Sequence, residues 1–444
     1  MSHVATTPEN PGTPDNPGTP DATTKTAPQG VPLVRHWKAP IGFAVLTAVA
    51  LLFFAILGPD GTATFRLSRD QDAVQLPALV IPAKAAGYVI AVICALITVL
   101  AYRKVRQTGK TPGWMSAVIA TVFVAGFLIW LVGGTNSTTI SLVGLLTGAM
   151  LIVVPIAYGA LSGIMSERAG VVNIAIEGQL LGGAFTAALV GSMTGNAFAG
   201  LVAAALAGVL VSLVLASFAI KYLVNQIIVG VVLNVLVSGL TGFFYEKFMA
   251  SPTSPLNQPP RMPAIKIPVL GDIPVIGPLF FDQSILGYLL LVLVVGMWWA
   301  LFRSKWGLRV RAVGEHPQAA DTLGINVNRT RFWNVVLGGA IAGIGGAYFT
   351  LVATSAFSKD MSGGLGFIAL AAMIFGRWNP IGAFLAAMLF GVARNLESNL
   401  SVAGSAVPGE FLNMLPYALT ILAVSGLVGR ARPPAASGVP YVKG

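Results

Sequence analysis

Long apolar runs dominate the chain. From residue 41 almost to the end, runs near the length of about 20 residues that spans a bilayer alternate with short polar segments. The tenth run is too short to span alone and the fifth is interrupted by polar residues, so a broken or re-entrant element is expected at either place. The pattern predicts twelve apolar segments, at residues 41–58, 85–102, 114–132, 142–164, 173–191, 199–220, 227–246, 285–302, 334–354, 366–376, 381–397 and 411–428.

Composition excludes a water-soluble globular enzyme. Only 10% of the 444 residues are charged and 55% are hydrophobic, whereas a soluble domain carries about 25% charged residues. The mean hydropathy is +0.79. A single cysteine, Cys94, and three histidines exclude a disulfide framework and leave little for a metal cluster. The sequence therefore predicts an all-α, polytopic transmembrane protein with no metal site.

The positive charges orient the chain. The net charge is +11, from 27 Lys and Arg against 16 Asp and Glu. If the N-terminus is cytoplasmic and all twelve segments cross, 19 of these cations lie on the inner side and 8 on the outer, which accounts for all 27. We therefore expect both termini to be cytoplasmic. Most of the positive excess then faces anionic lipid, so no nucleic-acid partner is expected.

The densest polar set inside the apolar chain is SERAGVVNIAIEGQLLGGAF, residues 166–185. Asn173 and Glu177 are four residues apart and share a helix face, and the surrounding glycines permit a helix break. One interpretation is a kinked half-helix beside a solute path. The alternative is that Glu167 and Arg168 cap a cytoplasmic turn while the other two are satisfied between helices. Asn234, on one face of the seventh segment, suits interhelical hydrogen bonding as well as a pore.

Two further patterns concern architecture. The glycines and alanines of residues 338–347 indicate tight helix packing. GAFTAALVG at 183–191 resembles GAFLAAMLFG at 382–391, and a polar break precedes each, as in transporters built from repeats.

No phosphate loop is present, because the only Gly-Lys-Thr, at 109–111, has Lys104 where the first glycine must be. The functional classes that remain are transport and membrane scaffolding. The chain is not expected to bind ATP through a phosphate loop.

Three passages resemble a known family. From about residue 114 to 428 the chain is similar to the permease subunits of bacterial ABC importers of the ribose and branched-chain amino acid type. Within that group it most resembles nucleoside permeases that work with a basic-membrane-protein lipoprotein. The passages are GALSGIMSERAGVVNIAIEGQLL (159–181), GLRVRAVGEHPQAADTLGINVNRTRF (307–332) and GFIALAAMIFGRWNPIGAFLAAMLFG (366–391).

The resemblance implies two sets of functional residues. The first would form a short coupling helix that touches an ATPase, and Pro317 suits its first turn while an alanine pair suits close packing into a partner's groove. Its members are Gly314, Glu315, Pro317, Ala319, Ala320, Gly324 and Ile325. The second set would border the translocation path. Its members are Asn173, Glu177, Gly178, Gln179 and Asn234, with Asn379 opposite.

Composition and the resemblance together predict an organisation and partners, with the N-terminal tail and hairpin as additions to the family's usual ten spans. Residues 1–38 would be a disordered Pro/Thr-rich cytoplasmic tail, 39–113 an additional transmembrane hairpin, 114–430 a ten-helix permease core and 431–444 a second cytoplasmic tail. The chain would carry no cofactor and no catalytic residue, because ATP and Mg²⁺ would bind a separate ATP-binding cassette ATPase. The other partners would be a second homologous permease chain in a heterodimer, an extracellular substrate-binding lipoprotein and a small polar substrate, at the bacterial cell membrane.

The function expected is import of nucleosides. A sugar such as ribose, or a branched-chain amino acid, is the alternative within the class. A proton-coupled secondary transporter with Glu177 as the proton carrier is the alternative of another class, and a scaffold without transport is a third.

Overall fold

The computed structural model describes residues 37–69, 75–134, 139–251, 254–402 and 432–443. Nine helices within these ranges are long and apolar enough to cross a membrane, so the predicted all-α polytopic fold is confirmed. Helix α1 (Lys38–Val49) and three others continue into wider π-helical turns, and a separate π-helical turn lies at Gly277–Phe281. The remaining helices are α2 (Ala83–Thr108), α3 (Gly113–Gly133), α4 (Leu142–Arg168), α5 (Ile176–Thr194), α6 (Ala197–Ala216), α7 (Gln226–Phe244), α8 (Ile285–Arg303), α9 (Lys305–Glu315), α10 (Pro317–Thr322), α11 (Val327–Tyr348), α12 (Leu365–Phe375) and α13 (Pro380–Val402).

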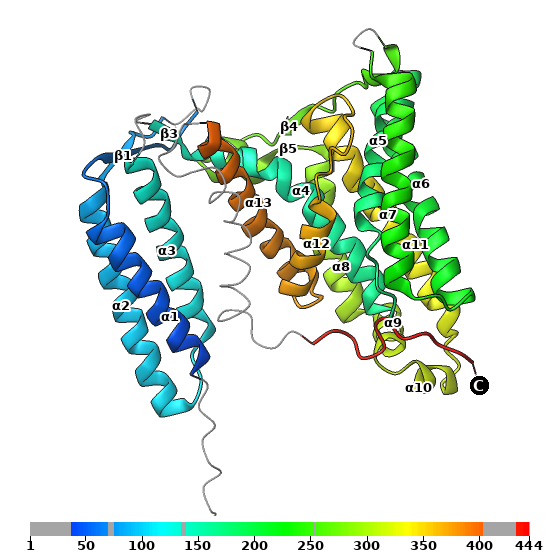
Figure 1. Cartoon of the computed structure of the whole chain (residues 1–444), viewed down its shortest axis with the longest axis horizontal. Helices are drawn as coiled ribbons and strands as arrows, with labels where there is room; N and C mark the ends of the chain where they lie inside the picture. The colour runs from blue at the N-terminus through cyan, green and yellow to red at the C-terminus, as the bar shows by residue number, and fades with distance from the viewer. Residues whose placement is uncertain (1–36, 70–74, 135–138, 252–253, 403–431, 444) are drawn as a thin grey trace, which may run out of the picture.

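Short strands mark one end of the helix bundle. The strands are β1 (Thr62–Arg66), β2 (Leu79–Pro82), β3 (Thr139–Ser141), β4 (Ala264–Lys266) and β5 (Asp282–Ser284). β1 pairs antiparallel with β2 and parallel with β3, and β4 pairs antiparallel with β5. We call this end the sheet face. The opposite end carries α9, α10 and residues 432–443, and we call it the α10 face (Figure 1).

Nine of the twelve expected segments correspond to the nine long helices. The twelfth, 411–428, lies outside the described residues. The fifth and tenth correspond to α5 and α12, which are the two places where the sequence indicates a break. α5 begins only at Ile176. α12 has 11 residues and is therefore about 16 Å long, roughly half the hydrocarbon thickness.

Helix α11 forms the centre of the bundle and packs against α4, α5 and α6 (Figure 1). Its glycines meet the backbone of these neighbours directly. Gly343 lies against the carbonyl of Ala204, and Gly346 lies against that of Leu180. The prediction of tight packing at residues 338–347 is thus confirmed, because a side chain at these positions would hold the helices apart.

Helices α1 to α3 form a separate hydrophobic cluster around Phe54 and Ile119. Among the described residues, α3 packs with the remaining helices at its sheet-face end, where Leu131 contacts Leu145 and Leu396. Arg69 adds an ion pair with Asp282 at 3.2 Å. α3 therefore packs with the additional hairpin as well as with the expected core, and the proposed boundary at residue 113 stays a prediction.

Candidate functional site

An extended segment leads into helix α5. α4 ends at Arg168, and the chain turns at Gly170, whose φ of +92° suits glycine. The backbone then runs back into the bundle without helical structure until Ile176. Ile176 packs against Gly159 and Gly163 of α4, five to nine residues before that helix ends. At 1.5 Å per residue, α5 begins about 10 Å inside the bundle.

Side-chain amides satisfy this irregular backbone. Gln226 accepts a hydrogen bond from the Val172 N–H at 2.7 Å. Asn234 accepts from the Gly178 N–H and donates to the Ile174 carbonyl, both at 2.8 Å. Non-helical backbone at membrane depth is tolerated where it is buried in protein or lines a water-filled cavity, and here the amides pair its polar groups inside the protein. The interhelical interpretation of Asn234 accounts for both of its hydrogen bonds.

Asn173 and Gln179 form a buried network with two serines. Both side chains are fully buried. The Asn173 amide donates to Gln179 at 3.1 Å, and Gln179 donates to Ser212 of α6 at 2.9 Å. Ser162 of α4 completes the set. The network joins α4, α5 and α6, and its assignment to the translocation path stays a prediction.

Glu177 lies where two helix N-termini meet. Its carboxylate accepts hydrogen bonds from the Ser362 hydroxyl at 2.6 Å, the Gly364 N–H at 2.9 Å and the Gly366 N–H at 2.6 Å. These donors are the first turn of α12 and the residues that precede it. Glu177 is itself in the first turn of α5. A carboxylate at the positive ends of two helix dipoles is electrostatically favoured.

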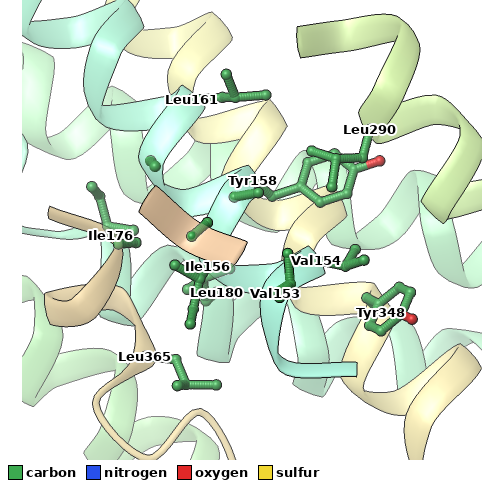
Figure 2. Close-up of a cluster of buried hydrophobic side chains, with 14 of the residues drawn as sticks. Val153, Val154, Ile156, Tyr158, Leu161, Ile176, Leu180, Leu290, Tyr348 and Leu365 are labelled. Carbon is green, nitrogen blue, oxygen red and sulfur yellow. The ribbon is translucent and has the colours of Figure 1, made fainter. Parts of the chain in front are cut away.

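The start of each half-helix is also held by apolar contacts. Ile176 and Leu365, the first residues of α5 and α12, belong to one buried cluster together with Ile156 and Leu180 (Figure 2). The glycine pair Gly363 and Gly364 has φ values of +52° and +80°, which lets the chain turn tightly into α12. The N-terminal ends of α5, which has 19 residues, and of the short α12 therefore meet within the bundle, and the two helices run in opposite directions from Glu177 toward the two faces.

The far end of α12 lies at the α10 face. Glu167 accepts a hydrogen bond from the Trp378 indole at 2.6 Å, and Arg168 donates to the Trp378 carbonyl at 3.0 Å. Asn379 caps α13 by accepting from the Ile381 N–H at 3.0 Å. Among the described residues Asn379 makes no hydrogen bond with Asn173. Its expected place opposite Asn173 on the path stays a prediction.

The expected coupling residues lie at the α10 face, and three of them, Glu315, Ala319 and Gly324, are exposed. α10 begins at Pro317, as expected for a proline in a first helical turn. The alanine pair is divided, however, because Ala320 is buried inside the protein and only Ala319 faces outward. The side chain of Leu323 is 80% exposed. Gly324 follows with a φ of +80° and open space around it.

The rest of the expected coupling set holds α9 and the loop after α10 in place. Gly314 is packed against the Arg168 carbonyl, where a Cβ would not fit. Glu315 is exposed and accepts a hydrogen bond from the Ala435 N–H at 3.1 Å. The Ile325 N–H donates to the Ala320 carbonyl at 3.1 Å.

A cavity opens toward the sheet face. Its volume is about 680 Å³, within the range of small-molecule sites. Polar and apolar groups share its wall, and among the described residues Arg261 has no hydrogen-bond or ion-pair partner. The lining includes Arg69, Thr147, Leu151, Arg261, Gln283 and Tyr348.

Comparison with known proteins establishes the family. A family model described as the permease component of branched-chain amino acid transport systems matches residues 145–424. The match contains both half-helices, Glu177 and α10. The chain is a permease of this family. The permease is therefore a transport component and a multi-pass membrane protein.

Several relatives are similar over most of their length. The permease is 41% identical over 303 residues to the guanosine ABC transporter permease protein NupQ of Bacillus subtilis, covering 65% of this chain and 93% of NupQ. It is 39% identical to the nucleoside ABC transporter permease protein NupC of Lactococcus lactis, with the same coverage. The putative glucose ABC transporter permease protein TsgC13 of Haloferax volcanii is 32% identical over 65% of this chain and 92% of its own length. No solved structure matches the chain.

Sequence reasoning missed several residues that complete these sites. It did not pair Glu177 with Ser362, Gly364 and Gly366, although two glycines directly before an apolar run could have indicated the start of α12. It also missed Trp378 as the partner of Glu167. No local signal identifies these pairs, because 185 or more residues separate their members.

Proposed function

We propose that the permease is the membrane subunit of an ATP-driven ABC importer for nucleosides in the bacterial cell membrane. The observation that carries this proposal is the 41% and 39% identity to permeases named for guanosine and nucleoside transport, each covered over 93% of its length. The partners are a separate ATPase that binds ATP and Mg²⁺, a second homologous permease chain and an extracellular substrate-binding lipoprotein. This chain contributes half of the path and no catalytic residue.

The position of Glu177 supports a neutral solute. In other transporters, half-helix N-termini within the membrane bind anionic groups of the substrate. Here the Glu177 carboxylate already accepts hydrogen bonds from the α12 terminus. A substrate carboxylate would compete with it, so a nucleoside or a sugar fits the site better than an amino acid does. The similarity to TsgC13 keeps a sugar as the second candidate.

The permease acts by conformational change. The ATPase contacts the exposed side of α10 around Ala319, Leu323 and Gly324, and its differential contacts shift the permease between inward-open and outward-open states. α12 transmits this movement, because Trp378 at one end is bonded to Glu167 of α4 while Gly366 at the other end is bonded to Glu177.

Reconstituted vesicles test the function. The permease, its homologous partner and the ATPase are expected to take up radiolabelled guanosine or adenosine only with internal ATP and the external lipoprotein. Unlabelled nucleosides should compete and ribose should not. Competition by ribose alone would transfer the assignment to sugars. Uptake without ATPase, driven by a proton gradient, would favour a secondary transporter with Glu177 as the proton carrier.

We further assign the sheet-face cavity as the outer entrance, and a single-cysteine experiment tests it. Cys94 is the only cysteine and is buried, so Cys94→Ala supplies the background. Thr147→Cys places a thiol on the cavity wall. A membrane-impermeant maleimide should label it, and nucleoside delivered by the lipoprotein should slow labelling about fivefold, as expected when solute fills most sites.

Thr194→Cys is the matched control, because it is exposed at the sheet-face end of α5 and does not line the cavity. Its labelling should not respond to nucleoside. Equal labelling of Thr147→Cys with and without nucleoside, in vesicles that do import nucleoside, would reject the entrance and leave the function intact.

A further inference from the structure

The C-terminal residues 434–441 bind back onto the α10 face of the permease. Pro434, Ala436 and Tyr441 are buried, although the segment has no regular secondary structure. Its backbone bonds to two separate elements. The Ala436 N–H donates to the Gly314 carbonyl of α9 at 2.8 Å, and the Gly438 N–H donates to the Gly170 carbonyl at 3.3 Å.

Two side chains complete the attachment. Arg331, near the start of α11, is 2% exposed and donates to the Val439 carbonyl at 2.9 Å. Tyr441 packs into a cluster with Val313 of α9, Ala320 of α10 and Val327 of α11. Burial, followed by the adjacent Asp321 carboxylate, raises the pKa of Tyr441.

The segment therefore connects α9 and α10, which carry the expected coupling residues, to the site around Glu177. One end of the connection is α9 and α10. The other is Gly170, the turn from which the extended segment runs to Ile176 and Glu177. α10 has only six residues, and a helix of that length is held by its tertiary contacts rather than by its own hydrogen bonds. Without Tyr441, the inward face of α10 would lose an aromatic contact.

We propose that residues 434–441 form a strap that transmits movement of α10 to the extended segment and so couples the ATPase to the path. This inference rests on the proposed function, because it gives the strap a role in ATP-driven import. The strap positions α10 and Gly170 and does not itself contact solute. Without the strap, movement of α10 by the ATPase would be taken up by backbone rotation at His316 and Gly324, which flank this short helix.

Coupling is tested with the full importer complex in vesicles. Truncation after Pro433 is expected to leave ATP hydrolysis within about twofold of wild type while nucleoside uptake falls at least tenfold, which is the signature of an uncoupled importer. Tyr441→Ala should give the same direction of change and Tyr441→Phe should retain uptake. Val442→Ala is the matched control, because the neighbouring Val442 is 68% exposed.

A second measurement needs no transport. Val313 is fully buried beneath Tyr441. In the Cys94→Ala background, Val313→Cys should react with a thiol reagent at least about tenfold faster after truncation or after Tyr441→Ala, because the strap no longer covers it. If the thiol introduced by Val313→Cys stays equally protected, the proposal that residues 434–441 cover α9 is wrong. A truncated complex that takes up as much nucleoside per ATP hydrolysed as wild type would also contradict the proposal. A wild-type complex that imports no nucleoside would reject the proposed function alone, since the labelling result still decides whether the strap covers α9.

Discussion

Replacing Glu177 with alanine is expected to abolish uptake and to lower the stability of the permease. The Gly364 and Gly366 N–H groups and the Ser362 hydroxyl would lose their acceptor within the bundle. Unpaired buried donors cost about 1–3 kcal/mol each, so a loss of roughly 3 kcal/mol or more is expected for three donors. Thermal unfolding of the purified complex and ATP-driven nucleoside uptake measure the two effects.

Glu177→Gln separates the two roles considered for this residue. The glutamine carbonyl can still accept one hydrogen bond from the α12 terminus, but its amide group would face a donor and the charge would be lost. An intermediate loss of stability is therefore expected, with residual ATP-driven uptake. A proton carrier would instead lose transport completely while keeping its stability.

Glu246→Gln is the control for this series. Glu246 pairs with Lys359 at 2.8 Å on the surface, where both side chains are more than half exposed. Such pairs contribute about 0–1 kcal/mol, so this variant should behave like wild type. Wild-type stability and uptake in Glu177→Ala would contradict the role assigned to the carboxylate.

The helices were predictable from sequence because lipid imposes a simple rule. A membrane-spanning segment must be apolar and helical, so runs of apolar residues identify the helices directly. Breaks in α5 and at α12 were predictable for the same reason, since polar residues and glycines interrupt the runs there. The nine long helices all fall on expected segments.

The contacts that build the site were not predictable in the same way. Asn173 and Glu177 share a helix face only if both are helical, but α5 begins at Ile176 and the extended backbone directs Asn173 into a different network. Glu177 meets residues beyond position 360, and that contact depends on how the half-helices are arranged in space. Tyr441 gives no local signal either, because its cluster is assembled from α9, α10 and α11.

The tight packing of α11 gives the second large effect. Gly346→Ala is expected to prevent correct assembly, because the new methyl group would overlap the Leu180 carbonyl and the Ala184 N–H of α5. Backbone atoms cannot rotate away as a side chain can, so α11 and α5 would have to separate. Overpacking of a buried site costs about 1–3 kcal/mol and more where the backbone must move.

Gly296→Ala is the matched control for this change. Gly296 is also a helix glycine, in α8, and an added Cβ there has no neighbour within 4 Å. Yield and thermal unfolding in detergent should fall sharply for the first variant and stay at the wild-type level for the second. Because Leu180 directly follows Gln179, separation of α11 from α5 would also disturb the start of α5, so any Gly346→Ala protein that assembles should lose uptake. Equal stability and uptake in both variants would show that α11 does not hold the half-helix in place.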